Sequence, residues 1–177
     1  MKTFKIYFEQ NRDTVSIFPG GFKPPTRGHF EAMEELLKNS DRGIVFIGKS
    51  PRDGIDQDMS YQIWSIYAPY LSKPIEVFKS SITPVKSTYD FAIDNPNVNI
   101  IVGAGPDDSE RYNSFIKNKE KYPLVSIVNI KETGGGVRGT TTREKILSKD
   151  PTAIEFFVPE IIKETDRERI KKILGIA

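Results

Sequence analysis

A stretch near the N-terminus, residues 18–33, combines two glycines, a lysine and the only histidine of the chain. Gly20 and Gly21 lack the Cβ atoms that would keep an anion away from backbone N–H groups. A helix that begins near Gly28 would direct its positive dipole end to the same place. His29 would then lie in the first turn, where its ring can donate a hydrogen bond to a phosphate oxygen. A simple turn or a surface histidine would explain each feature alone, but together they predict a polyphosphate-binding loop.

A second glycine-rich segment, residues 136–143, reads Gly-Val-Arg-Gly-Thr-Thr-Thr-Arg and again leads into an expected helix. An ordinary helix start at Thr140 explains it equally well when it is taken alone. If it binds an anion, the amides at the start of that helix are the expected donors.

The bulk composition restricts the classes of function. A chain of 177 residues with 37% hydrophobic and 28% charged residues is expected to form about one domain with one core. A net charge of +2 provides no general attraction to nucleic acid or to membranes, so neither is an expected partner. Zero cysteines and one histidine exclude disulfides, thiolate catalysis and zinc sites built on cysteine or several histidines. No signal peptide or membrane span is recognised, so we expect a soluble, cytoplasmic protein.

Short runs of branched apolar residues alternate with helical patterns along the chain. Such alternation predicts a Rossmann-like, doubly wound α/β fold with five parallel strands and helices on both faces of the sheet. The expected strands are residues 15–18, 43–47, 75–78, 99–102 and 124–128. The expected helices cover residues 30–37, 63–71, 85–93, 110–118, 140–148, 152–157 and 159–174.

We interpret the whole chain, residues 1–177, as a single domain. Its Rossmann-like core is expected to cover residues 14–150, and C-terminal helices residues 151–177. Residues 1–13 would form an N-terminal extension, within which residues 4–8 have a strand pattern. An edge strand and a mobile arm explain this pattern equally well.

In an open α/β sheet, ligands bind beyond the carboxyl ends of the strands, and residues 18–33 occupy such a position. Thr26-Arg27-Gly28-His29, preceded by Gly-Phe-Lys-Pro, resembles the His/Thr-x-Gly-His signature of the nucleotidylyltransferase superfamily. The second segment resembles the Ile-Ser-Ser-Thr-x-x-Arg signature of the same superfamily. The matching positions are Val137, Arg138, Gly139, Thr140 and Arg143. The pattern also resembles a group of bacteriophage-encoded transferase-like proteins.

The resemblance implies nucleotidyl transfer. A phosphate or hydroxyl of an acceptor attacks the α-phosphorus of a nucleoside triphosphate, and pyrophosphate leaves. The catalytic residues would be His29, Thr26, Lys23 and Arg143, and Mg²⁺ would be carried by the nucleotide, with no metal site formed by the protein. The nucleotide-binding residues would be Gly20, Gly21, Phe22, Gly28, Gly103, Gly105, Asp107, Val137, Gly139, Thr140, Thr141 and Thr142.

Other segments are candidates for acceptor binding. Lys49 and Arg52 follow the second strand, and either a phosphate contact or a solvated loop would explain them. Trp64 fits a core position better than a ring-stacking one, and Lys86 could face either the site or the solvent. Arg111 follows the fourth strand, where an ordinary turn is the alternative to a ligand contact.

The leading hypothesis is adenylyl transfer from ATP to a phosphorylated small molecule such as nicotinamide mononucleotide. Arg143 favours it, because cytidylyltransferases of this superfamily typically lack that arginine. A cytidylyltransferase that uses CTP and an alcohol or sugar phosphate is the first alternative, and a non-catalytic nucleotide-binding module is the second. Lys23 replaces an acidic or amide residue that is frequent in the family, and Arg138 replaces a serine. The sequence is compatible with a homo-oligomer.

Overall fold

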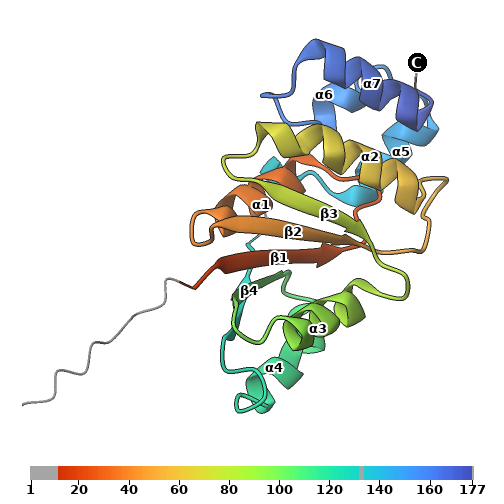
Figure 1. Ribbon diagram of the computed structural model, residues 1–177. Coiled ribbons are helices and arrows are strands. Elements are labelled where there is room, and N and C mark those ends of the chain that lie inside the picture. The colour runs from red at the N-terminus through yellow and green to blue at the C-terminus, as the bar shows by residue number, and fades with distance from the viewer. Residues whose placement is uncertain (1–11, 132–133, 177) are drawn as a thin grey trace, which may run out of the picture.

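The computed structural model describes residues 12–131 and 134–176, and its centre is a five-stranded parallel sheet. The strands lie in the order β3-β2-β1-β4-β5 (Figure 1). They are β1 (Thr14–Gly20), β2 (Arg42–Ile47), β3 (Ile75–Lys79), β4 (Asn99–Ala104) and β5 (Val125–Asn129). All four strand pairs are parallel. The predicted fold class is therefore confirmed, and each predicted strand lies within a few residues of its position.

Seven α-helices within the described residues cover the two faces of the sheet. They are α1 (Arg27–Leu37), α2 (Gln57–Tyr67), α3 (Pro84–Asp94), α4 (Asn113–Lys117), α5 (Gly139–Leu147), α6 (Ala153–Phe157) and α7 (Glu164–Leu174). Figure 1 shows α2, α5, α6 and α7 on one side of the sheet and α3 with α4 on the other. The C-terminal helices form an outer layer, because α7 packs on α2 rather than on a strand.

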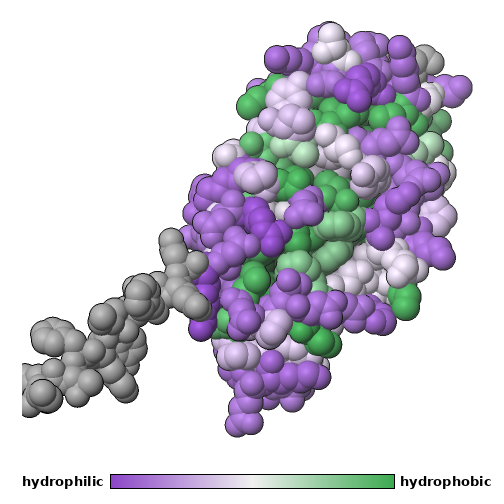
Figure 2. All heavy atoms as spheres, in the orientation of Figure 1, coloured by the Kyte–Doolittle hydropathy of each residue, from purple (hydrophilic) through white to green (hydrophobic). Residues whose placement is uncertain are grey.

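Each face of the sheet has its own hydrophobic core. On one face, α1 and α2 pack on β2 and α7 packs on the outer side of α2, with fully buried Met33, Trp64 and Ile170. On the other face, α3 and α4 cover β1 and β4 through residues such as Ile17, Val102 and Phe115. A strand covered on both faces has no polar side, which explains the continuous apolar runs in the sequence. In the space-filling view, hydrophobic residues lie in a band over the sheet between helices rich in hydrophilic residues (Figure 2).

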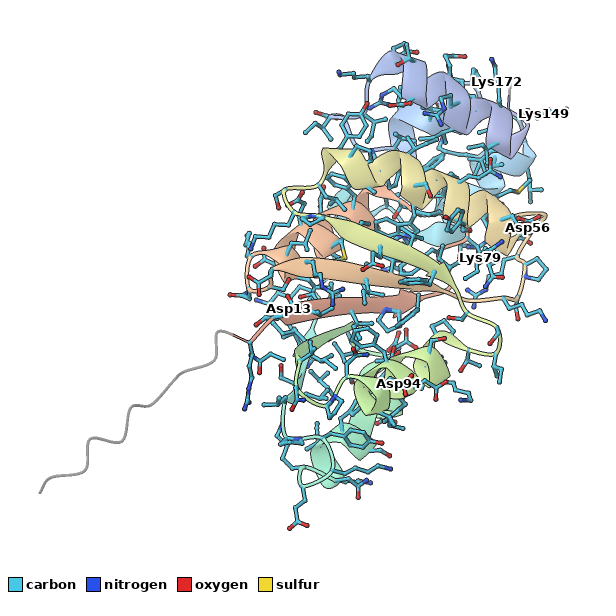
Figure 3. All side chains as sticks on the ribbon, viewed as in Figure 1. Asp13, Asp56, Lys79, Asp94, Lys149 and Lys172 are labelled. Atoms are coloured by element: carbon cyan, nitrogen blue, oxygen red, sulfur yellow. The ribbon has the colours of Figure 1, made fainter. Side chains whose placement is uncertain are left out.

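The strand order reverses between β1 and β4, which is where an open α/β sheet binds its ligands. The loops after these two strands therefore flank a crevice at the carboxyl edge. Asp56 and Lys79 lie near this edge of the sheet, and Asp13 lies at the opposite edge, before β1 (Figure 3). The first predicted motif follows β1 directly, so the topology puts it at the crevice.

Three helix predictions need correction. The helix predicted through Leu71 ends at Tyr67 and continues as a 3₁₀ turn that contains Pro69. The helix predicted over residues 110–118 is divided into a 3₁₀ turn and the short α4. The last helix begins at Glu164 and not at Pro159. The Pro159 carbonyl accepts hydrogen bonds from the Ile162 N–H and from the Arg167 side chain, which also donates to the Ile162 carbonyl, so these residues form a turn before the helix.

Within the described part of the chain, no helix is long and apolar enough to cross a membrane. The pattern predicted as a strand over residues 4–8 lies outside the described residues. The expected loop before α5 is described only from Gly134 onward, where it forms a short 3₁₀ turn with three glycines at positive φ.

Candidate active site

The loop between β1 and α1 leaves space for a ligand at Gly21. A Cβ atom added at Gly21 would meet no heavy atom within 4 Å, whereas one at Gly20 would lie 2.7 Å from the Phe22 ring. Phe22 itself has a φ of 51°, a conformation that side chains rarely adopt. Two contacts hold the strained turn: the Ser60 hydroxyl donates to the Phe22 carbonyl at 2.6 Å, and the Gly48 N–H donates to the Gly20 carbonyl at 2.8 Å.

The hydrogen bonds around His29 determine which nitrogen of its ring carries the proton. Thr26 precedes the first residue of α1, and its backbone N–H donates to His29 Nδ1 at 2.9 Å. Because Nδ1 is the acceptor, the proton of the neutral ring is on Nε2. The His29 ring packs edge-on against Phe22, with 5.0 Å between ring centroids. Burial lowers the pKa of His29 from 6.5 to about 4, so a neutral donor is present at physiological pH.

Lys23 connects two backbone segments beneath the site. Its Nζ donates to the Gly21 carbonyl at 2.6 Å and to the Gly48 carbonyl at 2.9 Å, and the residue is 4% exposed. Burial lowers the pKa of Lys23 from 10.5 to about 8, against the opposing attraction of Asp56. Lys23 therefore fixes the loop to the end of β2 in addition to bringing positive charge to the site.

The second glycine-rich segment packs directly on the first motif. A Cβ atom at Gly134 would lie 2.6 Å from both the Cα and the N atom of Gly28, so only glycine permits this approach. Arg27 Nε donates to the Gly134 carbonyl at 3.0 Å, and the Gly134 N–H donates to Glu31 Oε2 at 2.5 Å. The start of α1 thus anchors the segment that leads into α5.

Arg143 on α5 reaches back to the first motif. Its Nη1 donates to the Lys23 carbonyl at 3.1 Å, its Nη2 to the Thr140 hydroxyl at 3.4 Å, and its Nε to Asp53 Oδ2 at 2.6 Å. The first turn of α5 starts at Gly139, so its N–H groups and Arg143 share one end of the helix. The two predicted motifs, more than 100 residues apart in sequence, therefore meet in space.

Two cavities adjoin at this meeting point, with volumes of about 560 and 580 Å³. They share the wall made by Pro19, Gly20, Gly21, Phe22, His29 and Asp108. We call the first the switch-point cavity. It is also lined by Phe18, Thr26, Gly28, Ala32, Gly105, Pro106, Asp107, Ile130, Lys131, Val137 and Arg138. Both volumes are of the size that small-molecule sites usually have.

The second, which we call the cationic cavity, has a different charge. The cationic side chains that line it are Lys23, Lys49, Arg52, Arg111 and Arg143, and Asp108 is the only acidic one among its lining residues. Gly139 and Thr140 at the start of α5 line it too, as do Ile82, Thr83, Pro84 and Val85 before and within α3. A site of this charge favours a ligand with several negative charges.

Five predicted site residues line neither cavity. Trp64 is fully buried behind Phe22, so the prediction of an acceptor contact is wrong and the core interpretation is correct. Lys86 pairs with Asp90 along the exposed side of α3. Gly103 packs under α1, since a Cβ there would lie 2.5 Å from the Leu36 side chain.

The other two are consecutive threonines of α5. The Thr142 hydroxyl donates to the Arg138 carbonyl, and the residue is fully buried, so its predicted phosphate contact is wrong. The Thr141 side chain is exposed outside both cavities, although its backbone N–H belongs to the first turn of α5.

The sequence reasoning missed several residues of the site. Ile130 and Lys131 follow β5 and line the switch-point cavity. Their position after the fifth strand was a usable signal, because all parallel strands end at the same edge. Asp53 was missed as the partner of Arg143, since the two are 90 residues apart in sequence.

Comparisons with known proteins identify chains that share the fold and one that shares part of the sequence. No protein-family model matches the sequence. A nicotinamide-nucleotide adenylyltransferase of Pyrobaculum aerophilum is 32% identical over 73 residues, which are 40% of this chain and 41% of that protein. The chain therefore matches about two fifths of the length of this curated relative.

Solved structures with the same fold have low sequence identity to the chain. A Vibrio parahaemolyticus structure assigned as a nicotinate-nucleotide adenylyltransferase has a TM-score of 0.64 at 19% identity, covering 89% of this chain and 98% of its own. The Plasmodium falciparum nicotinic acid mononucleotide adenylyltransferase complexed with APC has a TM-score of 0.62 at 16% identity. The match covers 94% of this chain and 99% of the Plasmodium chain. A Francisella tularensis bifunctional NMN adenylyltransferase/ADP ribose pyrophosphatase has a TM-score of 0.58 at 14% identity, covering 92% of this chain and 51% of its own.

The solved structures establish the fold, the Pyrobaculum relative adds a direct sequence match, and the two motifs occupy the same end of the sheet. The chain therefore has the fold of the nicotinate- and nicotinic acid mononucleotide adenylyltransferases among these structures, and over about two fifths of its length it is similar in sequence to a nicotinamide-nucleotide adenylyltransferase.

Proposed function

We propose that this chain transfers the adenylyl group of ATP to the phosphate of a nicotinamide or nicotinic acid mononucleotide. The observation that carries the proposal is the His29 donor at the wall shared by the two cavities. The α-phosphate of ATP lies between the nucleoside and the β- and γ-phosphates. Hydrogen-bond donors that act on it must therefore lie between a nucleoside site and an anion site. The names of the Pyrobaculum, Vibrio and Plasmodium proteins support the choice of acceptor.

The two cavities suit different parts of the substrates. Ala32, Ile130 and Val137 give the switch-point cavity apolar walls suited to a planar base, and Asp107 can accept hydrogen bonds from ribose hydroxyls. The cationic cavity suits the β- and γ-phosphates beside Arg143 and the start of α5. It also suits the acceptor phosphate beside Lys49 and Arg52.

In the proposed reaction, an oxygen of the acceptor phosphate forms a bond to the α-phosphorus. The bond from the α-phosphorus to the bridging oxygen of the β-phosphate breaks, and pyrophosphate leaves with both electrons of that bond. The nucleophile is already an anion, so no side chain has to remove a proton. His29 Nε2–H and the amides near Gly21 would stabilise the charge that develops on the transferred phosphoryl oxygens.

Mg²⁺ carried by the nucleotide is part of the proposal. Among the described residues, no group of three or more histidine or acidic side chains lies close enough to hold a metal ion. An ion that arrives on a triphosphate takes its ligands from phosphate oxygens and water, and needs no cluster of protein carboxylates. When bound, it would neutralise phosphate charge.

The test is a coupled measurement of pyrophosphate and of the dinucleotide product by mass spectrometry. Each of the four nucleoside triphosphates is supplied with Mg²⁺ and either mononucleotide. We expect product with ATP, and a decrease in kcat/KM of about 10²- to 10³-fold in His29→Ala, the usual cost of losing one transition-state donor.

Lys86→Ala is the matched control, because it removes a cation that the sequence placed near the site and the structure places outside it. Its kcat/KM should equal that of the wild type. Turnover with CTP and an alcohol phosphate alone would identify a cytidylyltransferase. Nucleotide binding without any turnover would identify a binding module.

A further inference from the structure

Asp53 forms a close ion pair with Arg143, and this ion pair takes no part in the proposed reaction as described above. The Arg143 side chain is only 13% exposed, and Asp53 Oδ2 lies 2.6 Å from its Nε. With the contacts to the Lys23 carbonyl and the Thr140 hydroxyl, three of the five guanidinium N–H donors are used. The other two remain available to an anion in the cationic cavity, which Arg143 lines.

The turn that carries Asp53 is rigidly built. Arg52 and Ile55 exchange backbone hydrogen bonds of 3.0 and 2.9 Å across the two-residue turn Asp53-Gly54. Both turn residues have positive φ, 49° and 80°, which is the geometry that aspartate or asparagine followed by glycine adopts readily. Ile55 is 2% exposed and fixes the turn to the core. The carboxylate of Asp53 is therefore held in place by the fold.

The backbone of this turn does not require a carboxylate. Asparagine tolerates the left-handed conformation at least as well as aspartate. The turn itself has no need of a negative charge at residue 53. The carboxylate instead has Arg143 as its partner.

We propose that Asp53 is a positioning residue that holds the Arg143 guanidinium at the cationic cavity, ready to bind the triphosphate. The inference rests on the proposed function, because it assigns Arg143 to the β- and γ-phosphates. Asp53 contacts one edge of the guanidinium and thereby restricts its orientation before the nucleotide arrives, which lowers the entropic cost of binding. It also joins the loop of Lys49 and Arg52 to α5, so both phosphate-binding segments are held relative to each other.

Asp53→Asn is the test, since it keeps the turn and removes the charge. We expect the Kd and the KM for Mg-ATP to increase about tenfold, as for the loss of one charge-assisted contact. At saturating ATP, kcat and the KM for the acceptor should change less than about twofold. A substitution that merely loosened the fold would change kcat and both KM values together.

The matched control is Asp58→Asn, which removes an ion pair of similar length, to Lys79 at 2.7 Å, on a side chain that lines neither cavity. It should leave the affinity for ATP unchanged. In an Arg143→Ala background, Asp53→Asn should have no further effect on ATP affinity, because the two residues act through one contact.

Binding by calorimetry separates this inference from the proposed function, with Mg-ATP and inorganic tripolyphosphate as probes. If the wild type binds ATP but makes no product, the proposed reaction fails, and a weaker Asp53→Asn complex still supports the role of Asp53. If Asp53→Asn binds both probes within about twofold of the wild type, the inference is overturned whatever the turnover. If the wild type binds neither probe, both proposals fall together.

Discussion

At the scale of single residues, the protonation state of His29 follows from its surroundings. The Thr26 N–H occupies Nδ1, and the aromatic ring of Phe22 borders the imidazole. Burial disfavours the charged ring, so the donor that faces the cavities is a neutral Nε2–H. A neutral donor can stabilise developing charge without titrating in the physiological range.

Because His29 is the only histidine of the chain, its ring can be followed by NMR without assignment. We expect the ligand-free protein to titrate near the lowered pKa of about 4. Between pH 6.5 and 4 the unfolded state binds this proton and the folded state does not. The free energy of unfolding should therefore decrease as the pH falls through that window. His29→Gln should lose this contribution in urea titrations, and a wild-type midpoint near 6.5 would contradict the prediction.

At the scale of elements, the site depends on the contact between the start of α1 and the glycine turn before α5. Gly134 approaches Gly28 more closely than a side chain permits, and two further hydrogen bonds hold it there. Arg143 then reaches the cationic cavity because α5 starts from a fixed point. The element that presents Arg143 is thus positioned by the first motif itself.

Gly134→Ala tests this contact, and Gly136→Ala is its matched control. Both glycines have positive φ, 72° and 79°, but a Cβ at Gly136 would meet no atom within 4 Å. The control should lose about 1 kcal/mol of unfolding free energy from backbone strain alone. Gly134→Ala should lower the unfolding free energy by about 2 kcal/mol more than the control does, which is within the range for overpacked sites. Its KM for ATP should also rise. Equal losses in urea titrations would show that the Gly28 contact is unimportant.

At the scale of the whole molecule, the C-terminal helices support the site from a distance. The α7 helix packs on α2 through buried Ile170, and the Tyr70 hydroxyl donates to Asp166 at 2.7 Å. Through Trp64, α2 also supports the Phe22 ring, and Phe22 in turn packs against His29. This outer layer should therefore contribute stability without contacting a substrate.

Ile170→Ala should accordingly lower the free energy of unfolding by about 2 to 4 kcal/mol, the usual cost of a buried isoleucine truncated to alanine. Its kcat and KM, measured well below the unfolding temperature, should match those of the wild type. Ile161→Ala is the control, because Ile161 is 59% exposed and should change stability by less than about 0.5 kcal/mol. A large change in KM for Ile170→Ala would mean that α7 also shapes the site.

The sequence by itself determined the fold class and the two motifs. Apolar runs mark strands buried on both faces, and glycines before a helix mark an anion site, because both signals depend on neighbouring residues alone. Thr26, His29 and Arg143 were found in this way, and they line the adjoining cavities.

Only the tertiary structure decided which charges face one another. Lys86 forms an ion pair with Asp90 on its own helix, and the Thr142 hydroxyl donates to the Arg138 carbonyl. Arg143 donates to Asp53, which is 90 residues away in sequence. Side-chain direction depends on how helices pack on the sheet, and a contact between distant loops exists only after the chain has folded. The sequence therefore indicated which residues could carry the chemistry, whereas packing set the geometry in which they meet.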